Sequence, residues 1–249
     1  MCQSKAQGGR RCPSSDPAIR RAREIFPSYS KNSVITGDNM DTSYQQQADE
    51  YVSSLSTEEK KWVESYVNQD YEDINNALWN DQNHEGTEAL DSAFSKAPGI
   101  QKTLYRKPAF IGNREDIEEE VSRLKAGETI TCKGYSSTSE NPNALLPLLH
   151  NEVRVSKVFP PKDTEEFIKE HDKTYQNVVY EIVTDKGCPV SPLSHMPQEQ
   201  EWLLPRNQKF KVVRIYDNVE MTSSVRLVDN TPQPPVSKKV KVVQMIPVD

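Results

Sequence analysis

The spacing of apolar residues in the first half of the chain is that of helices. From position 62, apolar side chains recur at intervals of three and four residues, the period of an amphipathic helix that buries one stripe. Ser56 and Glu59 precede this run with the spacing of a capping box, so we expect the helix to begin there, with a kink near Asp70. The predicted stripe consists of Trp62, Val63, Tyr66, Val67, Tyr71, Ile74, Ala77 and Leu78.

Helical spacing also precedes and follows this stretch. It begins at Tyr44, and it returns in residues 87–97, where Pro98 and Gly99 would end the helix. The first half of the chain is therefore predicted to consist mainly of helices.

After residue 99 the pattern changes to short apolar runs separated by turn residues, which is typical of strands. In this part only residues 114–125 and 164–173 have helical character. Helices first and many short strands later predict an α+β fold. The expected strands are residues 103–106, 129–132, 136–139, 153–158, 178–184, 201–204, 209–216, 221–228 and 239–246, with a proline-rich link at 231–235.

Residues 1–42 have little apolar periodicity and many glycine, proline and serine residues, which indicates a flexible tail. A short basic helix is expected within it, at residues 16–25. Seven basic and three acidic residues give positions 1–40 a charge of +4, so the rest of the chain carries −10. The tail is either an arm for delivery or docking, or a solvated segment. The sequence thus predicts a basic tail at 1–42 and one domain at 43–249.

The composition narrows the class of protein. With 249 residues, 35% hydrophobic and 27% charged, the chain suits one substantial soluble domain. No apolar run approaches the ~20 residues of a membrane span, and the N-terminus lacks the apolar stretch of a secretory signal peptide. We therefore expect a cytoplasmic protein without a membrane partner. The net charge of −6 argues against broad binding of nucleic acid.

The four cysteines offer no obvious metal site. They stand at positions 2, 12, 132 and 188, without a C-x-x-C spacing and without a histidine cluster. We interpret them as reduced thiols and expect no metal.

Three polar motifs stand beside the predicted strands. Glu199 and Glu201 precede an apolar run, and on an extended backbone they would point to the same side. Upstream, Arg106 ends a predicted strand, and a guanidinium can bind phosphate oxygens in a fork. Between them, Ser137-Thr138-Ser139 would form a strand on which Ser137 and Ser139 share one face.

An arginine, then an S-T-S strand, then E-x-E before an apolar run resembles the R-S-E class of ADP-ribosyltransferases. This class includes cholera-toxin-like, C3-like and binary-toxin-like enzymes and the Alt and Mod enzymes of phages. Residues 71–78 are similar to the Y-x-x-I-N-x-x-L segment of that family, and the resemblance covers roughly residues 43–213. It implies N-terminal helices packed on a mixed or antiparallel two-sheet core with an NAD cleft. The implied activity is transfer of ADP-ribose from NAD to a protein side chain.

The resemblance implies catalytic roles for three residues. Glu201 would bind the ribose 2′-hydroxyl and stabilise the positive charge that develops as nicotinamide leaves, and Ser137 would orient it. Glu199 would orient an acceptor arginine and take its proton. In the family E-x-E goes with arginine as acceptor, whereas Q-x-E goes with asparagine or other residues.

The resemblance also implies which residues bind NAD. Arg106 would contact the pyrophosphate, with Tyr105 beside it. Ser137, Thr138 and Ser139 would form the wall on the nicotinamide side. Asn75 either contacts the adenosine side or braces the site.

The loop at residues 186–198 leads into the E-x-E motif and, by resemblance, recognises the target protein. Leu193, His195 and Met196 are its exposed candidates for that contact. For His195 an ordinary loop histidine is the favoured interpretation over a catalytic one, because the mechanism does not need a histidine.

The expected partners are NAD and a target protein with an accessible arginine, and we expect the chain to be a monomer. The resemblance to phage enzymes suggests a phage or bacterial effector that works in the cytoplasm of a host cell and can be delivered with a virion. Two alternatives stay open. One is a catalytically inactive binding or virion-associated protein with a transferase fold. The other is a transferase whose acceptor is a nucleic acid or a small molecule.

Overall fold

A computed structural model describes residues 17–30, 33–36, 42–107, 124–145, 178–222, 226–228, 231–233 and 237–248. The predicted strand at 153–158 and the predicted helix at 164–173 lie outside these residues. So does the predicted helix at 114–125, apart from its last two positions.

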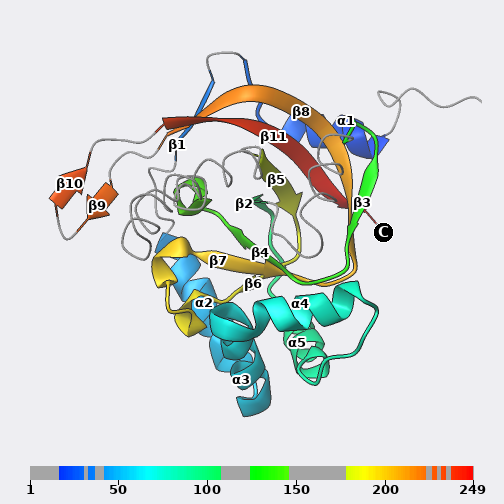
Figure 1. Ribbon diagram of the computed structural model, residues 1–249, viewed down its shortest axis with the longest axis vertical. Coiled ribbons are helices and arrows are strands. Elements are labelled where there is room, and N and C mark those ends of the chain that lie inside the picture. Colours follow the sequence, from blue (N-terminus) through cyan, green and yellow to red (C-terminus); the bar gives the residue numbers. More distant parts are fainter. Residues whose placement is uncertain are drawn as a thin grey trace, which may run out of the picture.

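The helices gather at one end of the molecule, as the apolar spacing predicted, and the long strands arch over the other end (Figure 1). Among the α-helices of the described residues, α1 lies apart from the others, on the side of the sheet. The helices are α1 (Pro17–Ile25), α2 (Thr42–Ser54), α3 (Thr57–Ser65), the π-helix η2 (Tyr66–Asp70), α4 (Tyr71–Trp79) and α5 (Thr87–Phe94), with short 3-10 turns η3 (Pro142–Leu145), η4 (Ser191–Leu193) and η5 (Pro197–Glu199).

The kink expected near Asp70 is the π-helix η2. A π turn holds more residues than an α turn, so the side chains that follow it are rotated relative to the preceding stripe. For this reason the prediction that Tyr71 belongs to the buried stripe is wrong: 47% of Tyr71 is exposed. Ile74 and Leu78, farther along α4, are buried as predicted.

Within the described parts of the chain, nine strands form one mixed sheet that consists of two halves. One half contains the long antiparallel pair β8 and β11, to which β1 and β5 add parallel and β3 antiparallel. The other half contains β4, β7 and β6, and it joins the first through β2 at the single residue pair Tyr105 and Ser139. The strands are β1 (Val34–Thr36), β2 (Lys102–Arg106), β3 (Thr129–Cys132), β4 (Ser136–Ser139), β5 (Val178–Thr184), β6 (Cys188–Pro189), β7 (Glu201–Leu204), β8 (Gln208–Thr222) and β11 (Ser237–Val248), with a separate hairpin of β9 (Arg226–Val228) and β10 (Thr231–Gln233).

The α+β class and the mixed sheet are confirmed. The two sheets expected from the resemblance correspond to the two halves of this sheet, which are connected at the residue pair Tyr105 and Ser139. A second difference concerns β8, which runs through positions 209–222 without the break predicted after 216. Residues 209–222 of β8 pair with β11, and the register shifts between Val240 and Val242 and again between Gln244 and Met245. Shifts of this kind are typical of β-bulges.

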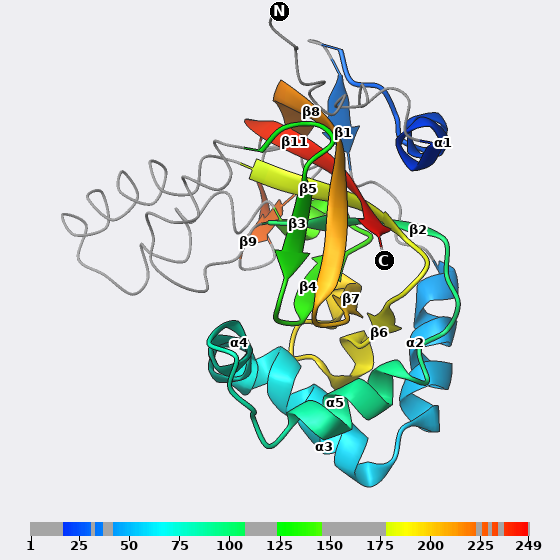
Figure 2. The same ribbon diagram turned by 90° about the vertical axis from the view of Figure 1, so that its right-hand side faces the viewer.

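The helical end and the second half-sheet share one apolar core. Trp62, Ile74 and Leu90 from the helices pack with Leu203 of β7, and all four are buried. Figure 2 shows α2–α5 below β6 and β7 in this arrangement. This packing fixes the helices against the strand that begins at Glu201.

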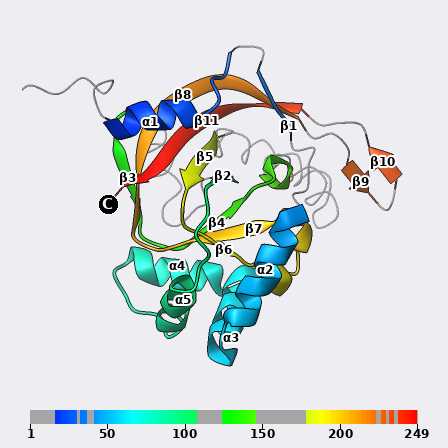
Figure 3. The same cartoon turned by 180° about the vertical axis from the view of Figure 1, so that it is seen from behind.

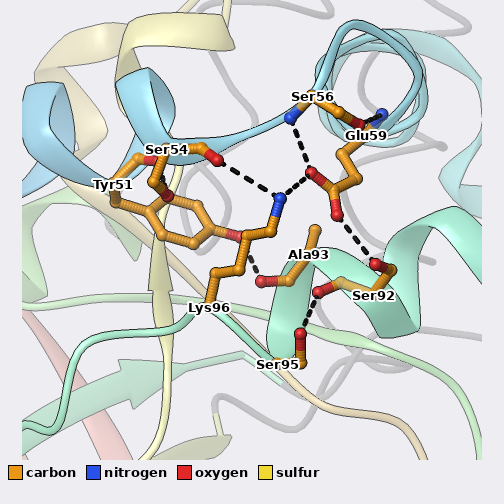
Figure 4. Close-up of polar contacts among 8 residues, drawn as sticks. All are labelled: Tyr51, Ser54, Ser56, Glu59, Ser92, Ala93, Ser95 and Lys96. Atoms are coloured by element: carbon orange, nitrogen blue, oxygen red, sulfur yellow. Dashed lines mark hydrogen bonds and ion pairs between the residues drawn. The ribbon is translucent and has the colours of Figure 1, made fainter.

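The predicted capping box is present and also joins two helices (Figure 4). Glu59 Oε2 accepts from the Ser56 N–H at 2.6 Å and from Lys96 Nζ at 2.5 Å, while Glu59 Oε1 accepts from Ser92 Oγ at 2.7 Å. The hydrogen bond from Lys96, followed by those from Ser56 and Ser92, lowers the pKa of Glu59 to about 2 against the opposing effect of burial. One carboxylate therefore caps α3 and ties it to α5.

Residues 17–30 and 33–36, which the sequence placed in a flexible tail, pack against the sheet. Ile19, Ala22 and Phe26 are buried in a cluster with Val183 and Val213, and Figure 3 shows α1 beside β8. The helix expected at 16–25 is present as α1. Ile19 and Ala22 of this helix, together with Phe26 directly after it, supply the buried contact that the tail prediction had discounted.

The segment that follows α1 is anchored by a buried carboxylate. Tyr29 Oη donates to Glu181 Oε1 at 2.9 Å, and Gln244 Nε2 donates both to Glu181 Oε2 and to the Pro27 oxygen, each at 2.8 Å. Glu181 is fully buried, and this burial raises its pKa. The N-terminal segment is thus part of the folded unit.

Candidate active site

A cavity of about 350 Å³ lies where β2, β4 and β7 approach the helical end. Its walls come from η2 and α4 on one side, from the ends of the three strands on another, and from the loop between β6 and β7. This volume is within the range of small-molecule sites. Arg106, Ser137, Glu199 and Glu201 all line it, so the three sequence motifs meet in one place.

Ser137 and Glu201 are hydrogen-bonded across two neighbouring strands. Ser137 pairs with Leu203 in the ladder between β4 and β7, and its Oγ donates to Glu201 Oε1 at 2.5 Å. Glu201 is 6% exposed, and this burial raises its pKa to about 7; the Ser137 bond and the charge of Arg106 oppose the shift, while Glu199 adds to it. The site therefore contains a carboxyl group that ionises near neutral pH.

The backbone of Glu201 is held by two residues that the sequence analysis did not identify. Its N–H donates to Ser191 Oγ at 2.8 Å, and the Tyr44 hydroxyl donates to its oxygen at 2.6 Å. The Ser191 N–H in turn donates to the Tyr44 hydroxyl at 3.2 Å. Tyr44 and Ser191 are almost fully buried, yet neither stands in a motif, so only the fold shows that they meet Glu201.

Arg106 ends β2 and lines the cavity. Its Nη1 donates to the Ser137 oxygen at 3.1 Å, which joins the end of β2 to β4 beyond their single paired position. The adjacent Lys107 is 9% exposed and also lines the cavity. Two cationic side chains therefore face the space in which Glu201 lies.

Glu199 reaches the same cavity by a different backbone path from the one expected. The segment from Glu199 to Glu201 is not extended: Glu199 ends the 3-10 turn η5, and Gln200 is left-handed with φ 48° and ψ 53°. This conformation is uncommon for a residue other than glycine. It reverses the chain before β7, so that both carboxylates line the cavity, and Ser139 Oγ donates to the Glu199 oxygen.

A model of the ADP-ribosyltransferase exoenzyme family matches residues 42–233. The chain belongs to this family. The family predicted from the three motifs is thereby confirmed, and so is the enzyme class, whose members use NAD as a substrate. No curated protein matches the chain in sequence.

Solved structures of ADP-ribosyltransferases have the same fold. Plx2a, an ADP-ribosyltransferase toxin from Paenibacillus larvae, is 16% identical with a TM-score of 0.53, covering 93% of this chain and 97% of its own. HopU1 of Pseudomonas syringae pv. Tomato DC3000 is 15% identical with a TM-score of 0.51, covering 84% of each chain.

The C2-I component of the C2 toxin from Clostridium botulinum is 20% identical with a TM-score of 0.53 over 86% of this chain. The chain spans about half of the length of C2-I, 48%. At such identities the likeness shows the fold alone.

Within this ADP-ribosyltransferase, Asn75 is placed as a brace. Its Oδ1 accepts from the Tyr135 N–H at 2.9 Å, and its Nδ2 donates to the Tyr66 hydroxyl at 2.8 Å. Gly134 lies against it so closely that a β-carbon there would be 2.4 Å from Asn75 Oδ1. Asn75 still lines the cavity, but its polar atoms are engaged with the protein.

The remaining predicted contacts divide into those that face the cavity and those that do not. Thr138, Ser139, His195 and Met196 line it. Tyr105 does not, because neighbouring strand residues point to opposite faces, and its hydroxyl donates to Glu181 at 3.3 Å instead. Its predicted role in binding NAD is therefore not supported.

Leu193 also departs from its prediction. It is partly buried and packs against the apolar core of the helical end, away from the cavity. It is thus not an exposed contact for a target protein.

Among the described residues, no three potential metal ligands cluster together. Within the same parts of the chain, no helix has the length and apolar character needed to cross a membrane.

Proposed function

We propose that this ADP-ribosyltransferase transfers ADP-ribose from NAD to an arginine of a target protein and releases nicotinamide. The observation that supports this most is the convergence of Arg106, the Ser137–Glu201 pair and Glu199 on one cavity. These are the groups needed to bind a pyrophosphate, to stabilise a cationic ribose and to accept a proton from the acceptor.

Glu201 is the proposed catalytic carboxylate. The bond between ribose C1′ and the nicotinamide nitrogen breaks with its electron pair going to nicotinamide, and positive charge develops on the ribose. A fixed carboxylate beside the 2′-hydroxyl stabilises that charge. Its side chain is oriented by Ser137, and its backbone by Tyr44 and Ser191.

Glu199 is the proposed determinant of the acceptor. An arginine guanidinium is protonated at ordinary pH and is a poor nucleophile. Glu199 orients one of its nitrogens toward C1′ and takes the proton as the new bond forms. It is only partly buried and lies at the loop side of the cavity, where an acceptor from another protein can enter.

The other cavity residues have proposed binding roles. Arg106 holds the pyrophosphate of NAD, while Thr138 and Ser139 form the wall beside nicotinamide. Asn75 supports this wall as a brace. His195 and Met196, which line the cavity from the loop, contact the target protein.

We further propose that the chain is a single catalytic domain at residues 43–249, to which residues 17–30 and 33–36 add a packed support. An effector acting on the proteins of a host cell, bacterial or phage-borne, fits the structural likeness to Plx2a, which is described as a toxin.

The test is to incubate the purified protein with labelled NAD and a cell lysate, beside Glu201→Ala. Label transferred to discrete protein bands by the wild type alone, on arginine by mass spectrometry, is the expected result. Label on another residue would overturn the arginine assignment only. If neither label transfer nor nicotinamide release occurs, the enzyme proposal fails and a binding protein with a transferase fold becomes the better explanation.

A further inference from the structure

Asn68, in the middle of the π-helix η2, contacts the loop that leads to Glu199. Its Nδ2 donates to the Leu193 oxygen at 2.7 Å, and its Oδ1 accepts from the His195 N–H at 2.7 Å. Nδ2 also donates to the Glu64 oxygen, 2.9 Å away on its own helix. The Asn68 side chain therefore makes hydrogen bonds to two backbone groups of the loop, and a third hydrogen bond anchors it to its own helix.

The three partners fix the orientation of the Asn68 amide. Its two N–H groups face two carbonyl oxygens, and its oxygen faces an N–H, so its donors match their surroundings. Turning the amide over would set Oδ1 against the carbonyl oxygens of Glu64 and Leu193 and lose all three bonds. Aspartate has almost the same shape, but it keeps only the acceptor.

The position of Asn68 in a π turn matters for this contact. The wider turn changes which side chains of the helix face the cavity, and Tyr66, Val67 and Asn68 all line it. Isolated π turns within α-helices often occur at functional sites. Here the turn brings a polar side chain to a loop 125 residues away in sequence.

The loop at residues 193–199 is exposed, but residues that lie outside it in sequence hold both of its ends. His195, Pro197 and Gln198 are exposed, and the bonds from Met196 N–H to Ser194 Oγ and from Glu199 N–H to the Met196 oxygen are local. Asn68 holds its first part, and Ser139 holds the Glu199 oxygen.

We propose that Asn68 is a positioning residue that holds the loop 193–199 so that Glu199 faces the acceptor. This rests on the proposed function, since it assigns Asn68 a role only through Glu199. Glu201 is fixed independently by Ser137, Tyr44 and Ser191. Loss of Asn68 therefore impairs transfer to the target protein and leaves cleavage of NAD to water intact.

The first test measures the loop itself, without NAD. Amide hydrogen exchange at His195 is compared in the wild type, Asn68→Ala and Asn68→Asp. Because His195 N–H donates to Asn68, exchange is expected to be about tenfold faster in Asn68→Ala, as loss of one hydrogen bond permits. Asn76→Ala is the matched control, since Asn76 is an exposed asparagine on the adjoining α4.

The second test measures two activities of the same variants. Transfer of ADP-ribose to the target protein is expected to fall about tenfold in Asn68→Ala and Asn68→Asp, an effect in the range of one lost hydrogen bond. Nicotinamide release without acceptor and the KM for NAD are expected to stay within about twofold. Asn76→Ala should match the wild type in both activities.

Each result bears on one claim. Unchanged exchange at His195 in Asn68→Ala overturns the loop contact, even if transfer falls, because direct contact of Asn68 with a substrate would then explain the loss. Equal loss of transfer and nicotinamide release overturns the positioning role. Wild-type transfer activity of Asn68→Asp, which keeps the acceptor but loses the two donated bonds, shows that those bonds do not hold the loop, and this also overturns the proposal.

Failure of the proposed function is distinguishable from these results. If the wild type neither transfers ADP-ribose nor releases nicotinamide, the function assigned to Glu199 is wrong, and the positioning role falls with it. The exchange measurement still decides whether Asn68 holds the loop.

Discussion

Ser137 Oγ lies 2.5 Å from Glu201 Oε1, although 64 residues separate the two in sequence. The contact follows from the pairing of β4 with β7, which sets Ser139 opposite Glu201 and Ser137 opposite Leu203. Glu201 is at once hydrogen-bonded, buried and close to a second carboxylate.

Glu201→Gln should abolish catalysis and stabilise the fold at alkaline pH. The pKa of Glu201 is raised to about 7, so its contribution to stability is present below pH 4.5 and is lost as the pH rises through 7. One pKa unit corresponds to about 1.4 kcal/mol, so the variant gains at most about 3 kcal/mol at pH 8. Urea denaturation at pH 8 and pH 5 measures this. Equal stabilisation at both pH values would contradict the ionisation argument, since protonated glutamate and glutamine are alike.

The kcat/KM for nicotinamide release should rise with pH and level off above about 7. The ionised form of Glu201 stabilises the cationic ribose, and kcat/KM reports the ionisation of the free enzyme. Below this pH we expect a tenfold loss for each unit. The measurement is initial rates between pH 5 and 9, over which the control Glu59→Gln should show the same midpoint. A midpoint near 4.5 would mean that Glu201 is not buried in the active enzyme.

Glu199→Gln should lose transfer to arginine by at least about a hundredfold, a typical effect of one acid–base group, while nicotinamide release persists. The neighbouring charge of Glu199 raises the pKa of Glu201, so its removal should also shift the pH midpoint of nicotinamide release downward. Transfer and release are measured separately on one preparation. Parallel loss of both would remove the acceptor role.

Gly134→Ala should destabilise the protein by about 1–3 kcal/mol, a typical effect of overpacking. The added β-carbon would lie 2.4 Å from Asn75 Oδ1, which is fixed by the Tyr135 N–H. Gly99→Ala is a suitable control because a β-carbon there meets no atom within 4 Å. Thermal unfolding compares the two variants. Equal stability of the two would show that Asn75 can move without cost.

Glu59→Gln should destabilise the protein by about 1 kcal/mol at neutral pH, since it weakens a capping bond and the pair with Lys96. The pKa of Glu59 is lowered to about 2, so its contribution is present above about 4.5 and is lost as the pH falls toward 2. The difference from wild type should therefore shrink between pH 5 and pH 3. Glu88→Gln, at an exposed position of α5, should show no such trend.

The sequence predicted those features that depend on neighbours along the chain. Ser56 and Glu59 predicted the start of α3 because a capping box involves residues only three positions apart in sequence. The order of arginine, S-T-S and E-x-E indicated the family because each motif is a short run. Tyr71 was misplaced because periodicity assumes an unbroken α-helix, and η2 interrupts it.

Other features depended on partners that are distant in sequence. Tyr44 looks like any aromatic residue of a helix until the fold brings its hydroxyl to Glu201. Tyr105 looked like a neighbour of Arg106 in the site, yet strand alternation directs it to Glu181 on the other face. No local pattern encodes either contact.

By itself, then, the sequence determined the α+β class and the family, and it made Glu199 and Glu201 candidate site residues, because these inferences depend on composition and short-range order. Only the tertiary structure decided that Gln200 turns the chain so that Glu199 and Glu201 share a cavity. It also decided that Asn68 hydrogen-bonds to the loop that precedes Glu199. Those contacts form because strand pairing and core packing bring remote segments together, and that geometry is a property of the whole fold.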